Sequence, residues 1–232
     1  MNLLAIETST ECCSAALSVD DRMIARSELA PRRHAELLLP MCEELLAEAG
    51  LARRDLDALA VGCGPGAFTG VRLAISAAQG IGFALAIPVV PVSSLAALAL
   101  QAPDNGAAIL AVIDARMGEI YAGTFRCTRK GGVEPIGAES VGAASVLELP
   151  DASAWNVIGS GWSTYRDVLL TRLPAPPLWA DGDRYPQAMD IARIALPLAR
   201  DGRGVAAEHV MPVYLRDKVA LTMLEQRQKT TR

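Results

Sequence analysis

The spacing of hydrophobic and polar positions changes along the chain and predicts the order of its elements. Short apolar segments within residues 3–29, separated by polar turns, predict three consecutive strands. Within residues 34–49 apolar positions recur every three or four residues, with glutamates on the opposite side, which predicts an amphipathic helix that stops at Gly50. A buried strand then leads into the glycine-rich loop "GCGPGAFTGVR" at 62–72. The helix predicted over 70–85 is apolar nearly all round, so it must be covered on two sides.

The second half of the chain echoes the first. The stretch "AVIDARMGEIYAGT" can be laid over "LAIETSTECCSAAL", which places Asp114 on Glu7 at the end of a first strand. Further on, "VIGSGWS" at 157–163 echoes "AVGCGPG" at 60–66, each a strand that ends in glycine turns. Two echoes in the same order predict a duplicated α/β unit, and a single unduplicated α/β fold is the alternative.

A linker signal, "APDNGA", separates the two repeats. We therefore expect an N-terminal lobe at 1–102 that carries the partner-binding helices, and a C-terminal lobe at 103–232. Late in the chain, residues 174–187 predict an exposed proline-rich loop and residues 188–200 a helix. The final helix or tail is expected to pack back on the N-terminal lobe.

The composition excludes several classes of protein. The 232 residues carry a formal net charge of −4, so the chain lacks the basic surface needed to bind nucleic acid by itself. Its five cysteines form no C-x-x-C pair, which argues against a disulfide framework and for a reducing compartment. The N-terminus has no signal-peptide pattern, and Pro88 and Pro91 interrupt the uncharged stretch 73–100, so no membrane span is expected. These features predict a cytoplasmic protein.

The glycine-rich loop does not match the common nucleotide motifs. A P-loop needs a lysine after its last glycine, and a dinucleotide fingerprint needs an acidic residue about 20 positions further on; both are missing. What remains is a helix N-terminus with free N–H groups at 69–72, which would either hold an anion or form a tight turn. Both interpretations stay open for the loop and the helix start, namely Gly62, Gly64, Pro65, Gly66, Thr69, Gly70 and Arg72.

Candidate catalytic and metal-binding residues are few. His34 and His209 have no companions at ligand spacing, so no metal site is predicted, and the sequence implies no cofactor. The nucleophile motif G-x-S-x-G is absent. Glu7 and Asp114, one from each repeat, would either face a shared cleft as a base or magnesium–nucleotide ligands, or be solvated carboxylates at strand ends.

Several stretches resemble the TsaB family of bacterial tRNA threonylcarbamoyladenosine biosynthesis along the whole chain: "LLAIETST", "GCGPGAFTGVRLAISAAQGIGFALAIPVVPVSSLAAL", "DARMGEIYAG" and "VYLRD". The resemblance implies the actin-like ATPase (ASKHA, ribonuclease H-like) fold, with two related lobes of mixed sheet and flanking helices. In the similar catalytic paralogue a His-x-x-x-His pair binds the metal, and those positions fall here on Ser94 and Leu98, which are unsuitable ligands. The resemblance therefore implies a non-catalytic sibling. The family usually has Asp where this chain has Glu7.

The same resemblance implies a scaffold subunit without catalytic residues of its own. It would bind the catalytic threonylcarbamoyl transferase paralogue (TsaD-type), help recruit a small P-loop ATPase (TsaE-type), and form a homodimer when alone. It would contact tRNA only as part of the complex, and it would not bind a membrane. The family contact uses the helices at 34–49 and 70–85, which gives the expected partner interface: His34, Leu38, Met41, Leu45, Val71, Ala74, Ile75, Ala78 and Gly82.

Three other functions are consistent with parts of the sequence. An actin-like-fold nucleotide phosphohydrolase or kinase would use Glu7 and Asp114 in magnesium-dependent turnover. A peptidase would need a metal or a nucleophile that the sequence does not offer. A self-contained homodimer with an unrelated regulatory role would leave tRNA modification normal when it is lost.

Overall fold

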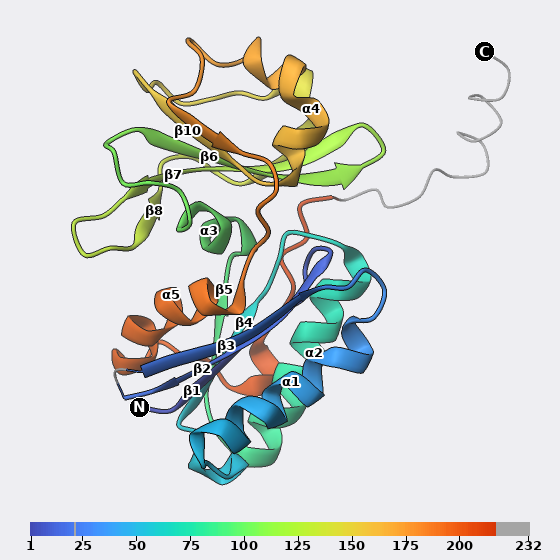
Figure 1. Ribbon diagram of the computed structural model, residues 1–232, viewed down its shortest axis with the longest axis vertical. Coiled ribbons are helices and arrows are strands. Elements are labelled where there is room, and N and C mark those ends of the chain that lie inside the picture. Colours follow the sequence, from blue (N-terminus) through green and yellow to red (C-terminus); the bar gives the residue numbers. More distant parts are fainter. Residues whose placement is uncertain (21, 217–232) are drawn as a thin grey trace, which may run out of the picture.

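The structure, a computed structural model, describes residues 1–20 and 22–216 and contains two mixed β-sheets, one above the other in Figure 1. The strands of the first sheet are β1 (Leu3–Glu7), β2 (Cys12–Val19), β3 (Arg22–Leu29), β4 (Ala58–Gly62) and β5 (Val89–Val92). Their spatial order is β3-β2-β1-β4-β5. β1, β2 and β3 pair antiparallel, whereas β1, β4 and β5 pair parallel. The three consecutive strands expected at the start of the chain are confirmed.

Helices cover both faces of this first sheet. α1 (His34–Ala49) and α2 (Phe68–Leu85) lie on one face, and α5 (Ala188–Arg200) lies on the other (Figure 1). α1 has the bounds that the sequence predicts, and Gly50 ends it in the left-handed conformation with a φ of 68°. Successive side chains of a strand point to opposite faces, so β1 contributes to both apolar clusters.

The second sheet is built from the next part of the chain. Its strands are β6 (Ala108–Arg116), β7 (Glu119–Cys127), β8 (Val133–Pro135), β10 (Trp155–Ile158) and β11 (Trp179–Asp181), in the order β11-β10-β6-β7-β8, with β9 (Ser140–Ala143) also paired to β7. α4 (Ser160–Leu170) packs on β6, and α3 (Ser94–Ala99) contacts both β6 and α5 between the sheets. Short 3₁₀ turns occupy Arg53–Asp55, Ala144–Val146 and Ala207–His209.

The two sheets have the same topology, which confirms the predicted duplication. β6 pairs antiparallel with β7 and parallel with β10, as β1 does with β2 and β4. In each repeat the second parallel strand ends in glycines and enters a helix, α2 in the first and α4 in the second. The expected α/β fold, with two related lobes of mixed sheet and flanking helices, is therefore present.

Two local predictions need correction, and one lies outside the described residues. The loop expected at 174–187 contains β11, a strand of only three residues that is too short to show a period. α2 begins at Phe68, two positions before the expected start at Gly70. The final tail from residue 217 lies beyond the described part of the chain, and the division at residue 102 stays a prediction.

Asp190 in the first turn of α5 gives a testable pH dependence. Its side chain is almost wholly buried, and this burial raises its pKa to about 6, although Arg193 Nη1 lies 3.1 Å from Oδ1. The folded pKa exceeds the ordinary value of 3.8, so the stabilisation is complete below pH 3.8 and is lost as the pH rises through about 6. The free energy of unfolding should therefore fall by up to about 3 kcal/mol between pH 4 and pH 8 through this group.

The Asp190→Asn variant isolates this contribution. It cannot ionise, so its free energy of unfolding should lack that part of the pH dependence, as measured by urea unfolding from pH 5 to pH 8. Asp201→Asn, at the exposed residue that follows α5, is the charge-matched control and should behave like the unmodified chain. Parallel pH profiles for the Asp190→Asn variant and the unmodified chain would contradict the assignment.

Candidate functional site

The glycine-rich loop packs on the end of β1 and the turn that follows it. A Cβ atom on Gly62 would lie 1.9 Å from Glu7 Oε2, and a Cβ on Gly70 would lie 2.0 Å from the Thr8 carbonyl oxygen. The Thr8 hydroxyl also donates to the Gly70 carbonyl at 2.7 Å, and Ala67 N donates to the Ser9 carbonyl at 2.7 Å. The glycines thus provide the space for a close approach of two backbones. The glycine-rich loop therefore packs closely against residues 7–9 of the same chain.

Arg72, the cation next to this loop, is held by aromatic rings. Its guanidinium carbon lies 3.2 Å from the ring centroid of Phe68 and 5.3 Å from that of Tyr214. Cation–π contacts of this kind occur within about 6 Å. Arg72 therefore ties the start of α2 to the last described segment of the chain.

Glu7 is a buried structural carboxylate. Its exposed fraction is 0%, Ser9 N donates to Oε1, and the Ser94 hydroxyl donates to Oε2 at 2.7 Å. Burial raises the pKa of Glu7 above its ordinary value, and the hydrogen bonds from Ser9 and Ser94 oppose part of that rise. Both interpretations of Glu7, a group facing a cleft and a solvated carboxylate, are thus corrected, because Gly62 and Ser94 close over its carboxylate.

Substitutions at Glu7 separate a structural role from a catalytic one. Glu7→Gln keeps an oxygen for Ser9 N and removes the buried charge, so the folded state should be retained. Because the folded pKa is raised, the unmodified chain loses stability as the pH rises, and the Gln variant should lose less. Glu7→Ala leaves Ser9 N without its acceptor and should cost about 2–3 kcal/mol in urea unfolding. Equal stability of the Ala and Gln variants would contradict this role.

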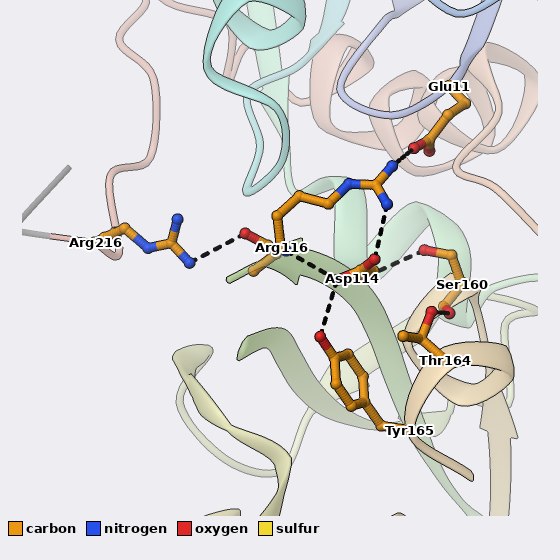
Figure 2. A network of polar contacts seen from close by, with 8 residues as sticks. Glu11, Asp114, Arg116, Ser160, Thr164, Tyr165 and Arg216 are labelled. Carbon is orange, nitrogen blue, oxygen red and sulfur yellow. Dashed lines mark hydrogen bonds and ion pairs between the residues drawn. The ribbon is translucent and has the colours of Figure 1, made fainter. Parts of the chain in front are cut away.

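Asp114 lies near the end of β6, the first strand of the second repeat, and, unlike Glu7, lines a pocket. Figure 2 shows its polar contacts. Its carboxylate accepts from Arg116 N at 2.8 Å, from Arg116 Nη1 at 3.0 Å and from the Tyr165 hydroxyl at 3.4 Å. Arg116 also pairs with Glu11 of the first repeat. The structure therefore joins Asp114 to Glu11 through an arginine, and it does not bring Asp114 and Glu7 together in one cleft.

Only an indirect signal in the sequence points to this ion-pair network. Arg116 and Glu11 are 105 positions apart; Arg116 is the last residue of β6, and Glu11 lies in the turn between β1 and β2. Arg216 belongs to the same junction, since it donates to Glu119 and to the Ala115 carbonyl. The duplication brings the β1–β2 turn and the end of β6 together, but the sequence does not show which side chains pair.

The two positions that the family resemblance aligns with metal-binding histidines lie inside the fold. Ser94 and Leu98 are both 0% exposed; the serine holds Glu7, and the leucine belongs to an apolar cluster with β6. Within residues 1–20 and 22–216, no three His, Cys, Asp or Glu side chains gather as a set of metal ligands. His34 and His209 lie on separate elements, α1 and a 3₁₀ turn.

The structure corrects where the predicted interface residues lie. His34 is half-buried, and the rest are buried against the sheet: Leu38, Met41, Leu45, Val71, Ala74, Ile75, Ala78 and Gly82. Apart from Gly82, these buried residues belong to the apolar cluster between the helices and β1, β2 and β4, because the sheet covers that side of both helices. They hold α1 and α2 in place, so a partner of these helices would contact other residues.

The outer side of α1 and α2 exposes a different set of apolar and small residues. Phe83 is 78% exposed, Leu39 53% and Phe68 52%. Small residues at every fourth position of α2, Ser76, Gly80 and Ala84, are also exposed. Among the described residues, α2 alone is long and apolar enough, by length and composition, to cross a membrane, but one side of it lies in the core. We call this exposed surface the α1–α2 face.

Comparison with known proteins gives the family. The family model described as TsaD, tRNA N6-adenosine threonylcarbamoyltransferase, matches residues 26–159. The tRNA threonylcarbamoyladenosine biosynthesis protein TsaB of Escherichia coli is 38% identical over 95% of this chain and 96% of its own length. The chain belongs to the TsaB family. The TsaB protein of Haemophilus influenzae is 34% identical over 98% of this chain and 99% of its own length.

A solved structure shows the same fold. YeaZ from Pseudomonas aeruginosa superposes with a TM-score of 0.85 at 43% sequence identity, over 92% of this chain and 99% of its own. The TsaB family expected from the sequence is therefore confirmed, and the chain shares the fold of YeaZ.

Proposed function

We propose that this chain is a non-catalytic subunit for threonylcarbamoyl transfer to the adenosine beside the anticodon of tRNAs. The observation that carries this proposal is the 38% identity to the E. coli TsaB protein over nearly the full length of both chains. That relative is named for tRNA threonylcarbamoyladenosine biosynthesis. The compartment that fits this role is the cytoplasm.

The buried polar groups support an accessory role. Ser94 and Leu98 stand where the paralogue's histidines would bind a metal, and both are fully buried. The Glu7 carboxylate accepts hydrogen bonds from Ser9 and Ser94, and the Asp114 carboxylate accepts hydrogen bonds from Arg116. The two candidate carboxylates, Glu7 and Asp114, thus each have structural partners among the described residues.

The α1–α2 face is the surface that we propose for the partner. Its occupant would be the TsaD-type catalytic paralogue, or a second copy of this chain in the absence of that paralogue. A standard stable interface buries about 800 Å² per partner, which two adjacent helices of this length can supply. Exposed Phe83 and Leu39 would provide apolar area, and the small residues of α2 would allow close approach.

Further partners follow from the same proposal. The complex would recruit the TsaE-type ATPase and would bind tRNA, since a chain with a net charge of −4 lacks a basic surface of its own.

Light scattering on a size-exclusion column tests the proposal. The chain is measured alone, then mixed with the catalytic paralogue of the same organism, and the mixture is assayed for threonylcarbamoyladenosine on tRNA with the ATPase present. We expect a stable mixed complex, and modification that needs both chains. Unchanged separate peaks at micromolar concentrations, or full modification without this chain, would reject the proposed role.

A further inference from the structure

The junction between the lobes contains a pocket of about 560 Å³ that the proposed subunit role does not use. Its wall combines the turn after β1, the first residues of α1 and α2, the end of β6, and the last described segment at 213–216. A volume of this size is in the range of sites for small organic molecules.

Three polar side chains of this wall, those of Ser9, Thr10 and His34, lack partners. Thr10 is 6% exposed, and its hydroxyl has no hydrogen-bond partner among the described residues. The same holds for Oγ of the buried Ser9 and for Nε2 of His34, the half-buried first residue of α1. All three residues line the pocket. Buried polar atoms are nearly always paired in folded proteins, so three unpaired ones at the same pocket indicate a missing partner.

The charges around the pocket indicate an anion. α1 and α2 both begin at it, and neither N-terminus has a side-chain cap, so both direct unpaired N–H groups and positive dipole ends towards this region. Arg32, which is exposed, also lines the pocket. The two carboxylates of the wall, Glu11 and Asp114, are both paired with Arg116.

The remaining wall is apolar. Phe68, Val71, Ile113, Tyr121 and Tyr214 line it, and the hydroxyl and imidazole groups lie to one side, on the first repeat. Such a pocket suits a ligand with an anionic end and an unsaturated or apolar body. We propose that it binds a small organic phosphate, whose oxygens accept from the Thr10 hydroxyl, His34 Nε2 and the helix N-termini.

Calorimetric titration of the full chain with phenyl phosphate tests this site, with inorganic phosphate and phenol as separate probes. Phenyl phosphate should bind one to one, at least about tenfold more tightly than either of the other probes. Thr10→Val and His34→Phe keep the size of each side chain but remove its polar atom, and each should weaken binding about tenfold. Thr164→Val, on α4 and outside the pocket, is the matched control and should bind like the unmodified chain.

The melting temperature distinguishes a ligand site from a structural one. Thr10→Val removes an unpaired buried hydroxyl. It should therefore raise the melting temperature of the free chain by about 2 °C while weakening the binding of phenyl phosphate. If the Thr10 hydroxyl stabilised only the fold, its removal would instead lower the melting temperature. Lack of saturable binding up to about 10 mM phenyl phosphate, equal binding of phenol, or unchanged affinity of Thr10→Val would overturn the proposal.

Discussion

Replacing Gly70 with alanine is expected to lower the free energy of unfolding by about 4 kcal/mol, near the upper end of single-residue effects. The added Cβ would lie 2.0 Å from the Thr8 carbonyl oxygen. That oxygen belongs to the backbone that follows β1, so relief requires α2 or the turn to move, and the hydrogen bond from the Thr8 hydroxyl to the Gly70 carbonyl would be strained.

Urea unfolding followed by circular dichroism measures this loss. Gly80→Ala in the same helix is the matched control, since a Cβ there meets no atom within 4 Å. Alanine is a better helix former than glycine, so this control should gain up to about 1 kcal/mol. Equal stability of the two variants would contradict the proposed close packing at Gly70, because helix propensity alone would then account for both substitutions.

Much of the fold could be predicted because its local patterns are strong. α1 shows a clear helical period closed by Gly50, and its bounds were predicted to the residue. The duplication was visible from the strand ends at Glu7 and Asp114, and both sheets share one topology. In contrast, β11 has only three residues in a proline-rich stretch, so its pairing with β10 has no local signature.

The orientation of α2 could not be predicted from its sequence. The helix is apolar nearly all round, so Ala78 and Gly80 fit a buried side equally well by composition. These two positions lie about 200° apart around the helix, and only the position of the sheet decides that Ala78 is buried and Gly80 exposed. Most residues predicted from the sequence to form the partner interface therefore lie in the core of the fold.

Long-range polar contacts also could not be predicted from the sequence. Glu7 reads as a carboxylate at an exposed strand end, yet Ser94, 87 positions away, donates to it inside the core. The pairing of Arg116 with Glu11 is equally remote in sequence. Such contacts depend on how the two repeats come together, which no local pattern records.

Gly80→Arg is expected to abolish binding of the catalytic paralogue, with a loss of affinity of at least about 100-fold. The residue lies in the middle of the exposed side of α2, between Ser76 and Ala84, where small side chains would let a partner helix approach. A long charged side chain there would hold the helices apart and would have to be buried without a designed partner, which costs several kcal/mol.

The same position separates binding from folding better than a core residue does. Arginine is a good helix former and a Cβ at Gly80 meets no atom within 4 Å, so the melting temperature should not fall. Arginine at Ala78, which is 0% exposed, would instead disrupt the core.

The measurement combines light scattering of the mixture, calorimetric affinity and the tRNA modification assay, with Gly80→Ala as the small-residue control. The Ala variant should bind and support modification normally, whereas the Arg variant should run as separate peaks and leave the tRNA unmodified. Normal complex formation by a folded Arg variant would place the partner on another surface. Loss of modification with an intact complex would point instead to a later step, such as recruitment of the ATPase.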